Sequence, residues 1–322
     1  MRKAFWMVAV AAGTVVLVLL LHYMRSRTSG SCLDAHSQCR YDLGSLKKTA
    51  ANTLIKAGVS YFSPAMSNLT ALAVDGNDNI VVGSRTGIEI LDAGGAHVAG
   101  FGVGAPVNCL AVTPDGDILA GSKDHIEVYA RDGTRKAVWK SPDPKADLTS
   151  IAAWSNSVYA ADCVNRVVWR FTLSGELMGR LGDSDNDRRK HGFVVPSAFF
   201  DVAVAADGSL WAANPGEHRL EHFTADGRFL AAWGRAALEA DGFCGCCNPS
   251  HFAIMPDGSF VTSEKHIVRI KVYNAGGEFK GIICGQEEWG KEAVGLDLAA
   301  NSRGRILVLD PQADVVRLYA MK

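Results

Sequence analysis

The segment Cys244-Gly245-Cys246-Cys247 carries the densest group of reactive side chains in this sequence. Two thiolates at CxxC spacing can converge on one metal ion, or they can perform thiol–disulfide exchange. Because the adjacent residues Cys246 and Cys247 would struggle to bind one ion together, a metal ion or an iron–sulfur cluster here would need a further ligand. His251 and Cys284 are the candidates for that ligand. The expected ligand set is therefore Cys244, Cys246, Cys247, His251 and Cys284.

Disulfide bonds are a second interpretation of the same cysteines. The chain has eight cysteines, and disulfides persist in oxidising compartments outside the cytoplasm. In such a compartment we expect a local Cys32–Cys39 bond and further pairs among the loop cysteines. The spacing does not determine which cysteines pair, so disulfide formation, metal or cluster binding and thiol exchange all stay open at this point.

The N-terminus indicates where the chain resides. Met1-Arg2-Lys3 precedes an uncharged, mainly apolar run from Ala4 to Leu21. As a helix this run would be about 27 Å long, close to the roughly 30 Å thickness of a bilayer core. We expect an uncleaved signal anchor within residues 1–28 and a linker over residues 29–52. A cleaved signal peptide is the alternative, although no small-x-small site follows Leu21.

The short basic tip is typical of a signal segment whose end stays in the cytoplasm. We therefore expect the body of the protein on the extracytoplasmic, periplasmic side, held to the membrane by its N-terminal helix.

Composition narrows the class of the remaining chain. The 322 residues include 33 basic and 34 acidic residues, which give a net charge of −1. A chain without a cationic field is not expected to bind nucleic acid. With 48% hydrophobic and 21% charged residues, the chain can bury a sizeable core. Its 33 glycines fit the many tight turns of repeated antiparallel hairpins.

A pattern of short strands recurs six times after Asn68. Repeats of about 40–50 residues indicate a propeller or a solenoid. Each unit begins with a short apolar strand, and these strands are 72–74, 110–112, 151–153, 202–204, 252–254 and 298–300. A tight turn and a return strand follow, with Asp115-Gly116, Asp207-Gly208 and Asp257-Gly258 as the clearest turns. A third, alternating strand and an outer strand complete a four-stranded blade.

The sixth unit ends at Lys322, directly after its third strand. A closed ring needs one more outer strand, and residues 53–61 are the expected donor. These patterns predict an all-β, six-bladed β-propeller over residues 53–322, preceded by one transmembrane helix.

The units resemble NHL repeats, most clearly in two segments. The segments are Asn165-Arg166-Val167-Val168-Trp169-Arg170-Phe171 and Gly216-Glu217-His218-Arg219-Leu220-Glu221-His222-Phe223. The resemblance covers nearly everything after Asn68 and implies a six-bladed propeller. It does not select a function, because the superfamily includes binding scaffolds, lyases and lactone hydrolases.

One face of the expected propeller collects the insertions. We call the upper face the one that carries the connections between second and third strands and between successive blades. Segments 182–198, 234–250 and 284–295 lengthen these connections, and variable loops on a rigid scaffold commonly carry function. The residues expected to bind a partner there are Phe243, Asn248, His218, His266, Glu264 and Lys265.

The expected function is that of a binding scaffold, docking a partner protein that could be a redox protein, because no complete catalytic motif is present. GxSxG, GxxxxGKS and HExxH patterns do not occur in the sequence. The first alternative is a propeller metalloenzyme, lyase-like or lactonase-like, with a metal at the channel mouth near His251, Asn248, Asn108 and Asp201. The second is a carrier of thiols, a metal or a cluster that uses the cysteine segment.

Overall fold

The structure is a computed structural model that describes residues 55–182, 192–289 and 293–321. The expected anchor (1–28), the linker (29–52) and the Cys32–Cys39 pair lie outside these residues. Among the described residues, no helix is both long and apolar enough to span a bilayer.

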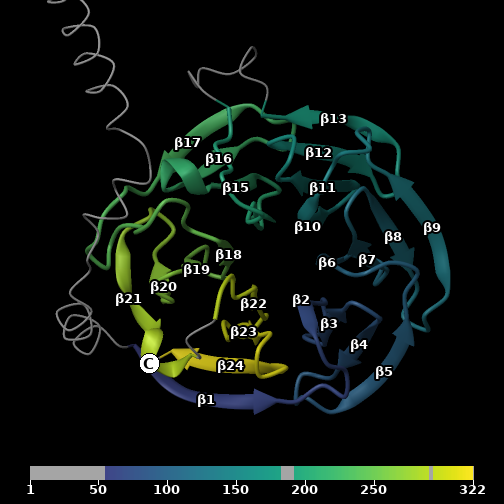
Figure 1. Ribbon diagram of the computed structural model, residues 1–322, viewed down its shortest axis with the longest axis horizontal. Helices are drawn as coiled ribbons and strands as arrows, with labels where there is room; N and C mark the ends of the chain where they lie inside the picture. Colours follow the sequence, from purple (N-terminus) through teal and green to yellow (C-terminus); the bar gives the residue numbers. More distant parts are fainter. Residues whose placement is uncertain (1–54, 183–191, 290–292, 322) are drawn as a thin grey trace, which may run out of the picture. The chain divides into compact units, whose positions relative to one another are not determined.

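Six four-stranded antiparallel sheets form the blades of a ring (Figure 1). The innermost strands are β2 (Leu69–Val74), β6 (Cys109–Val112), β10 (Leu148–Trp154), β14 (Val202–Val204), β18 (His251–Ile254) and β22 (Leu298–Ala300). The second strands are β3 (Ile80–Ser84), β7 (Ile118–Gly121), β11 (Ser157–Asp162), β15 (Leu210–Asn214), β19 (Phe260–Ser263) and β23 (Ile306–Asp310). The sequence-based prediction of an all-β, six-bladed propeller is confirmed.

The two outer layers complete each blade. The third strands are β4 (Gly87–Leu91), β8 (His125–Tyr129), β12 (Val167–Thr172), β16 (Arg219–Phe223), β20 (Ile270–Tyr273) and β24 (Val315–Met321). The outermost strands are β5 (His97–Gly102), β9 (Arg135–Lys140), β13 (Leu177–Leu181), β17 (Phe229–Trp233), β21 (Phe279–Cys284) and β1 (Lys56–Phe62). Burial decreases outward, since all five residues of β3 are buried and β5 has none that is.

The ring closes without a covalent bond. Strand β1 pairs antiparallel with β24, and its register places Val59 opposite Tyr319 and Tyr61 opposite Arg317. The N-terminal strand is thus the outer strand of the sixth blade, as the sequence predicts. Without β1, the outer edge of β24 would be an unpaired sheet edge to which another chain could add.

Tight turns and apolar packing explain why these residues form blades. Gly116 and Gly208 have φ values of 88° and 84°, a left-handed conformation that favours glycine in hairpin turns. Apolar side chains of adjacent blades pack together between the sheets, as Leu119 of β7 does with Val158 and Ala160 of β11. Each blade therefore depends on its two neighbours for a closed core.

The long connections gather on the upper face and belong to the second half of the ring. Residues 182–201 join β13 to β14, residues 234–250 join β17 to β18, and residues 285–297 join β21 to β22. Two single-turn helices, η1 (Pro215–Glu217) and η2 (Gln286–Glu288), add to the same region. We call residues 243–250 the cysteine loop.

Candidate functional site

One position of the third strand fastens the incoming connection in blades one and two. In blades one, two and four this position is Glu89, Glu127 and Glu221, which lie opposite Val82, Ala120 and Ala212 in register. The Glu89 carboxylate accepts hydrogen bonds from the backbone N–H groups of Ala65 and Met66, at 2.8 and 3.1 Å. Glu127 accepts one from Gly104 at 3.0 Å. A buried carboxylate therefore holds each of these two incoming connections.

Blade five carries the opposite charge at this position. Lys271 lies opposite Thr262, and its Nζ donates a hydrogen bond to the Gly242 carbonyl at 2.6 Å. Glu264 supplies the counter-charge, with its Oε2 3.2 Å from Lys271 Nζ and 2.6 Å from Arg269 Nε. We call Glu264, Arg269 and Lys271 the ion cluster; their exposed fractions are 0%, 4% and 0%.

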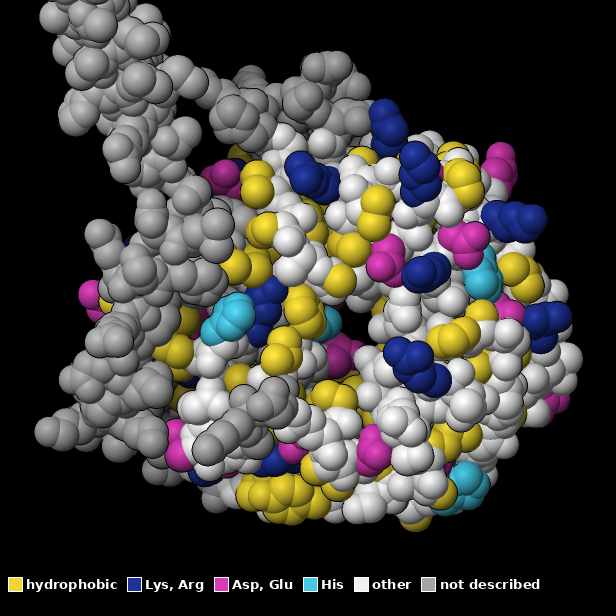
Figure 2. Space-filling view, in the orientation of Figure 1, with side chains coloured by type: hydrophobic (Ala, Val, Ile, Leu, Met, Phe, Trp, Pro, Cys, Tyr) yellow, Lys and Arg dark blue, Asp and Glu magenta, His cyan; other side chains and the backbone are white. Residues whose placement is uncertain are grey.

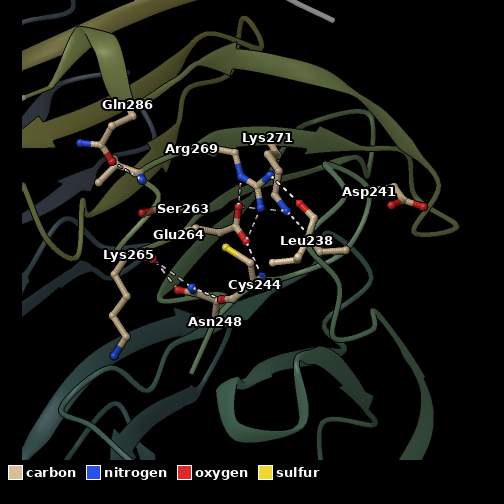
Figure 3. A network of polar contacts seen from close by, with 12 residues as sticks. Leu238, Asp241, Cys244, Asn248, Ser263, Glu264, Lys265, Arg269, Lys271 and Gln286 are labelled. Carbon is tan, nitrogen blue, oxygen red and sulfur yellow. Dashed lines mark hydrogen bonds and ion pairs between the residues drawn. The ribbon is translucent and has the colours of Figure 1, made fainter. Parts of the chain in front are cut away.

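The ion cluster reaches the cysteine loop directly, as Figure 3 shows. Glu264 Oε1 accepts a hydrogen bond from the Cys244 backbone N–H at 3.0 Å. Asn248 secures the other end of the loop, because its Nδ2 donates to the Cys244 and Lys265 carbonyls at 2.6 and 3.1 Å. The Lys265 N–H donates to Asn248 Oδ1 at 2.9 Å. The side chains of Glu264 and Asn248 therefore fix the backbone of the cysteine loop at both of its ends.

Burial and charge act in opposite directions in the ion cluster. Burial favours a neutral Glu264, but the charges of Lys271 and Arg269 outweigh it and hold the pKa of that carboxyl below its ordinary value. Burial lowers the pKa of Lys271 to about 8, although Glu264 acts to raise it. The cluster is stable as a set of opposite charges, and removal of one member leaves a buried charge with fewer partners.

Two adjacent thiols with different surroundings project from the cysteine loop. Cys246 is exposed, whereas Cys247 is only 3% exposed. Their Sγ atoms are 3.2 Å apart. Burial acts to raise the pKa of Cys247, but hydrogen bonds from Lys265 and Ser197 outweigh it and lower that pKa. Burial and the neighbouring Cys247 raise the pKa of Cys246. Cys247 is therefore the favoured thiolate of the pair.

Lys265, the lysine beside these thiols, is not part of the ion cluster. In Figure 3 the Lys265 side chain points away from Glu264. Its Nζ donates a hydrogen bond to Ser197 Oγ at 2.5 Å and lies 4.5 Å from the centre of the Phe199 ring. A positive charge near Cys247 favours its deprotonated form.

The five expected metal ligands are not brought together. Cys284 lies in the hydrophobic core with Val268 and Trp289, and burial raises its pKa to about 12. Burial also raises the pKa of Cys244, to about 11. No three or more His, Cys, Asp or Glu side chains within residues 55–182, 192–289 and 293–321 are arranged to hold a metal ion. Metal or cluster binding by Cys244, Cys246, Cys247, His251 and Cys284 stays a prediction without structural support.

The expected disulfides among the loop cysteines are absent from the described part of the chain. All six described cysteines are free thiols, namely Cys109, Cys163, Cys244, Cys246, Cys247 and Cys284. Cys109 and Cys163 lie in blades two and three, and the core position of Cys284 separates it from the cysteine loop. Among these six described cysteines, only Cys246 and Cys247 have their sulfur atoms side by side.

The expected partner-binding residues divide into two groups. Phe243, Asn248 and Glu264 are 0% exposed and Lys265 is 4% exposed, so these four support the loop instead of forming its surface. This corrects the role expected for them, because hydrogen bonds and ring packing turn them inward. His266 is exposed and His218 is half-buried, and both adopt positive φ values in upper-face connections. Of the six residues, these two histidines reach the surface.

His251 lies instead at the mouth of the central channel. Its Nδ1 is 3.7 Å from Asp201 Oδ2 and 3.7 Å from Asp297 Oδ1. Both carboxylates also accept backbone hydrogen bonds from a neighbouring blade, Asp201 from Phe252 at 2.7 Å and Asp297 from Leu72 at 2.8 Å. Burial raises the pKa of Asp297 to about 6, against the opposing effect of His251. The two carboxylates therefore join blades at the channel.

A cavity of about 250 Å³ occupies the channel and is lined by all six innermost strands. Figure 2 shows the channel as an opening near the centre of the ring, with acidic and histidine side chains at its edge.

Sequence reasoning missed Lys271, Arg269, Asp297 and Ser197. Lys271 had a detectable signal, because aligning the third strands places it where Glu89, Glu127 and Glu221 stand in other units. Ser197 and Asp297 gave no such signal, since only the folded ring brings their long connections to the thiols and to the channel.

The comparisons with known proteins support the fold. No protein-family model and no curated protein matches the sequence. Among solved structures, a streptogramin B lyase is 12% identical with a TM-score of 0.58, covering 82% of this chain and 98% of the lyase. A virginiamycin B lyase from Staphylococcus aureus has the same identity and TM-score, covering 82% of this chain and 99% of that one. The WD40 repeats of RRP9 are 13% identical with a TM-score of 0.59, and the match covers 84% of this chain and 99% of the RRP9 chain. The chain is thus a six-bladed propeller similar in fold to lyases and WD40 proteins alike.

Proposed function

We propose that this chain is an exported, membrane-anchored propeller of the NHL type that binds a partner protein through the cysteine-bearing upper face. One observation carries the proposal: a buried ion cluster fixes a loop whose tip, Gly245 and Cys246, is exposed. Burying charges is costly, and a loop that only connected two strands would not need such support.

A fixed loop is suited to binding. Association loses free energy when surface groups become ordered, so a surface that is ordered beforehand loses less. His266 is an exposed neighbour of this tip, since its ring is 3.7 Å from the position a Cβ on Gly245 would occupy. The proposed binding surface therefore consists of Gly245, Cys246, His266 and the half-buried His218.

The location of the protein is part of the proposal. The apolar run from Ala4 to Leu21 is long enough to cross a bilayer as a helix, and the basic residues at its start favour a cytoplasmic tip. The propeller would then face the extracytoplasmic side, where it can meet other exported proteins. A partner that itself carries reactive thiols fits the exposed Cys246.

Site-specific crosslinking in cells tests the binding surface. A photo-crosslinking residue at His266 should give a discrete crosslinked product with a second protein. The matched control is Asp132, which is exposed in the turn between β8 and β9 on the opposite face. Equal products from the two positions, or no product from His266, would overturn the proposal.

A channel-mouth enzyme is the second candidate, because His251 lies between the carboxylates of Asp201 and Asp297, which both line the cavity. A histidine so placed could act as a general base. The scaffold proposal is preferred, since Asp201 and Asp297 already accept backbone hydrogen bonds that join blades. If His251→Gln, but not a variant of the cysteine loop, abolished turnover of a substrate by the purified chain, the enzyme would be favoured.

A further inference from the structure

The adjacent thiols of the cysteine loop differ in a way that suits sulfur exchange. Cys246 is open to solvent and Cys247 is shielded, so a reagent too large to enter the loop can reach only Cys246. Their sulfur atoms, 3.2 Å apart, are farther apart than the roughly 2.05 Å of a disulfide bond. A displacement of about 1.2 Å would join them.

The second observation is the set of groups around Cys247. Lys265 and Ser197 act to lower the pKa of Cys247, and Lys265 is itself held between Ser197 Oγ and the Phe199 ring. These contacts stabilise a negative charge on Cys247, which makes it a good leaving group in thiol–disulfide exchange. The attacked sulfur is then exposed and the departing sulfur is stabilised.

We propose that Cys246 and Cys247 form a reversible thiol–disulfide exchange site that accepts electrons from a pair of thiols on a partner protein. The inference deepens the proposed binding function by naming the chemistry of the partner. The reduced site is the one described above, and a small disulfide such as glutathione disulfide converts it to the oxidised form.

The exchange proceeds in two balanced steps. In the oxidised site, a partner thiolate attacks Cys246 Sγ, so a partner–Cys246 disulfide forms and the Cys246–Cys247 bond breaks. The electron pair of that bond leaves on Cys247. A second partner thiolate then attacks the partner sulfur of the mixed disulfide, and Cys246 leaves. The partner gains a disulfide, and the site gains two electrons and the two protons that the partner thiols released.

Adjacent cysteines favour reversibility. Neighbouring Cα atoms lie about 3.8 Å apart across a trans peptide and closer across a cis one, whereas disulfides usually span about 4.4–6.8 Å. A bond between neighbours is therefore strained, and strained disulfides are readily reduced. This property suits exchange better than permanent stabilisation of the loop.

The test uses the full-length chain in a mild detergent, equilibrated with glutathione disulfide and glutathione at a series of ratios. After acid quenching and alkylation, trypsin releases residues 236–265 as one peptide that contains Cys244, Cys246 and Cys247. In excess glutathione disulfide this peptide should become two hydrogens lighter, and only Cys244 should be alkylated. In excess glutathione all three should be alkylated.

Four variants distinguish exchange from other chemistry. Cys244→Ser is the matched control and should keep the lighter peptide. Cys247→Ser should abolish it. Lys265→Met should shift the pH profile of Cys247 alkylation upward, with about a tenfold loss of thiolate for each unit by which its pKa rises. Lys265→Arg should restore most of the thiolate, which a loss of folding would not allow.

Three results would overturn the proposal. The pair could stay reduced at every glutathione ratio, the lighter peptide could vanish in Cys244→Ser, or the thiols could become reactive only after a chelator removes a bound metal. Because the test needs no protein partner, its failure leaves the binding surface untouched. A failed crosslink at His266 would likewise leave a positive exchange result standing.

Discussion

Lys271 Nζ lies 3.2 Å from Glu264 Oε2, and both side chains are completely shielded from solvent. The same strand position holds glutamate in blades one, two and four, where register places Glu89, Glu127 and Glu221. Blade six resembles blade five, because Arg317 donates to the Glu288 carbonyl at 2.8 Å and pairs with Asp310. Blades five and six therefore hold their incoming connections by a cation and its counter-ion, where blades one and two use a carboxylate.

Replacing Lys271 should destabilise the propeller strongly. Lys271→Met removes the donor to the Gly242 carbonyl and one partner of Glu264, and breaking a buried pair costs about 3–5 kcal/mol. We expect the lower end, about 3 kcal/mol, because Arg269 still pairs with Glu264. Urea unfolding of the full chain measures this loss. The control Lys136→Met removes a pair with Asp117 at the surface and should cost less than about 1 kcal/mol. Equal effects of the two changes would contradict the account.

The channel mouth should give a pH dependence of known sign. The pKa of Asp297 is raised to about 6 in the folded state, so between about pH 4 and that value the folded state binds more protons than the unfolded one. Its contribution to the free energy of unfolding is present at low pH and is lost as pH rises through this window. Asp201 and His251 are the titratable groups that face position 297, and both are present in the wild-type chain and in the variant tested below.

Asp297→Asn should therefore reduce the fall in stability of the wild-type chain between about pH 4 and pH 6. Denaturant unfolding at several pH values measures the slope. Asp132→Asn is the control, because hydrogen bonds to Thr134 lower the pKa of Asp132, and its loss should not reduce that fall. If the dependence of stability on pH were unchanged in Asp297→Asn, the pKa of the Asp297 carboxyl would not be raised in the folded state.

Ring closure should depend on one face of β1. Val59 is half-buried and packs against the core of the last two blades, whereas Ser60 is exposed. Val59→Asp should lower the unfolding free energy by an amount up to the roughly 1.5–3 kcal/mol that full burial of a valine contributes, plus a penalty for the charge. Ser60→Asp should have little effect. Thermal unfolding of both variants checks this, and similar melting temperatures would argue against β1 as the closing strand.

The sequence was sufficient to predict the blades because their periodicity is local. Short apolar strands, Asp-Gly turns and the missing last strand together specify six four-stranded sheets closed by residues 53–61. The matches at β14 and β22 are complete, since the expected first strands 202–204 and 298–300 are the observed Val202–Val204 and Leu298–Ala300. Such features depend on neighbours in the chain, which a sequence displays directly.

The candidate site could be predicted only in part, because its contacts join distant segments. The sequence located the cysteine loop, but not that Glu264 turns inward to the Cys244 N–H or that Lys265 reaches Ser197. Cys284 was expected as a further metal ligand beside the loop, yet it packs in the core. Residue types alone did not distinguish a charged surface from a buried ion cluster.

Amide hydrogen exchange in the cysteine loop tests the central claim most directly. The claim is that the ion cluster holds the loop in one conformation, with the Cys244 N–H bonded to Glu264. The Cys244 amide of the full-length chain should therefore exchange slowly, and Lys271→Met should accelerate this exchange more than that of amides in blade two. If the wild-type Cys244 amide exchanged as fast as amides of exposed turns such as Asp132-Gly133, the ion cluster would not be fixing the loop.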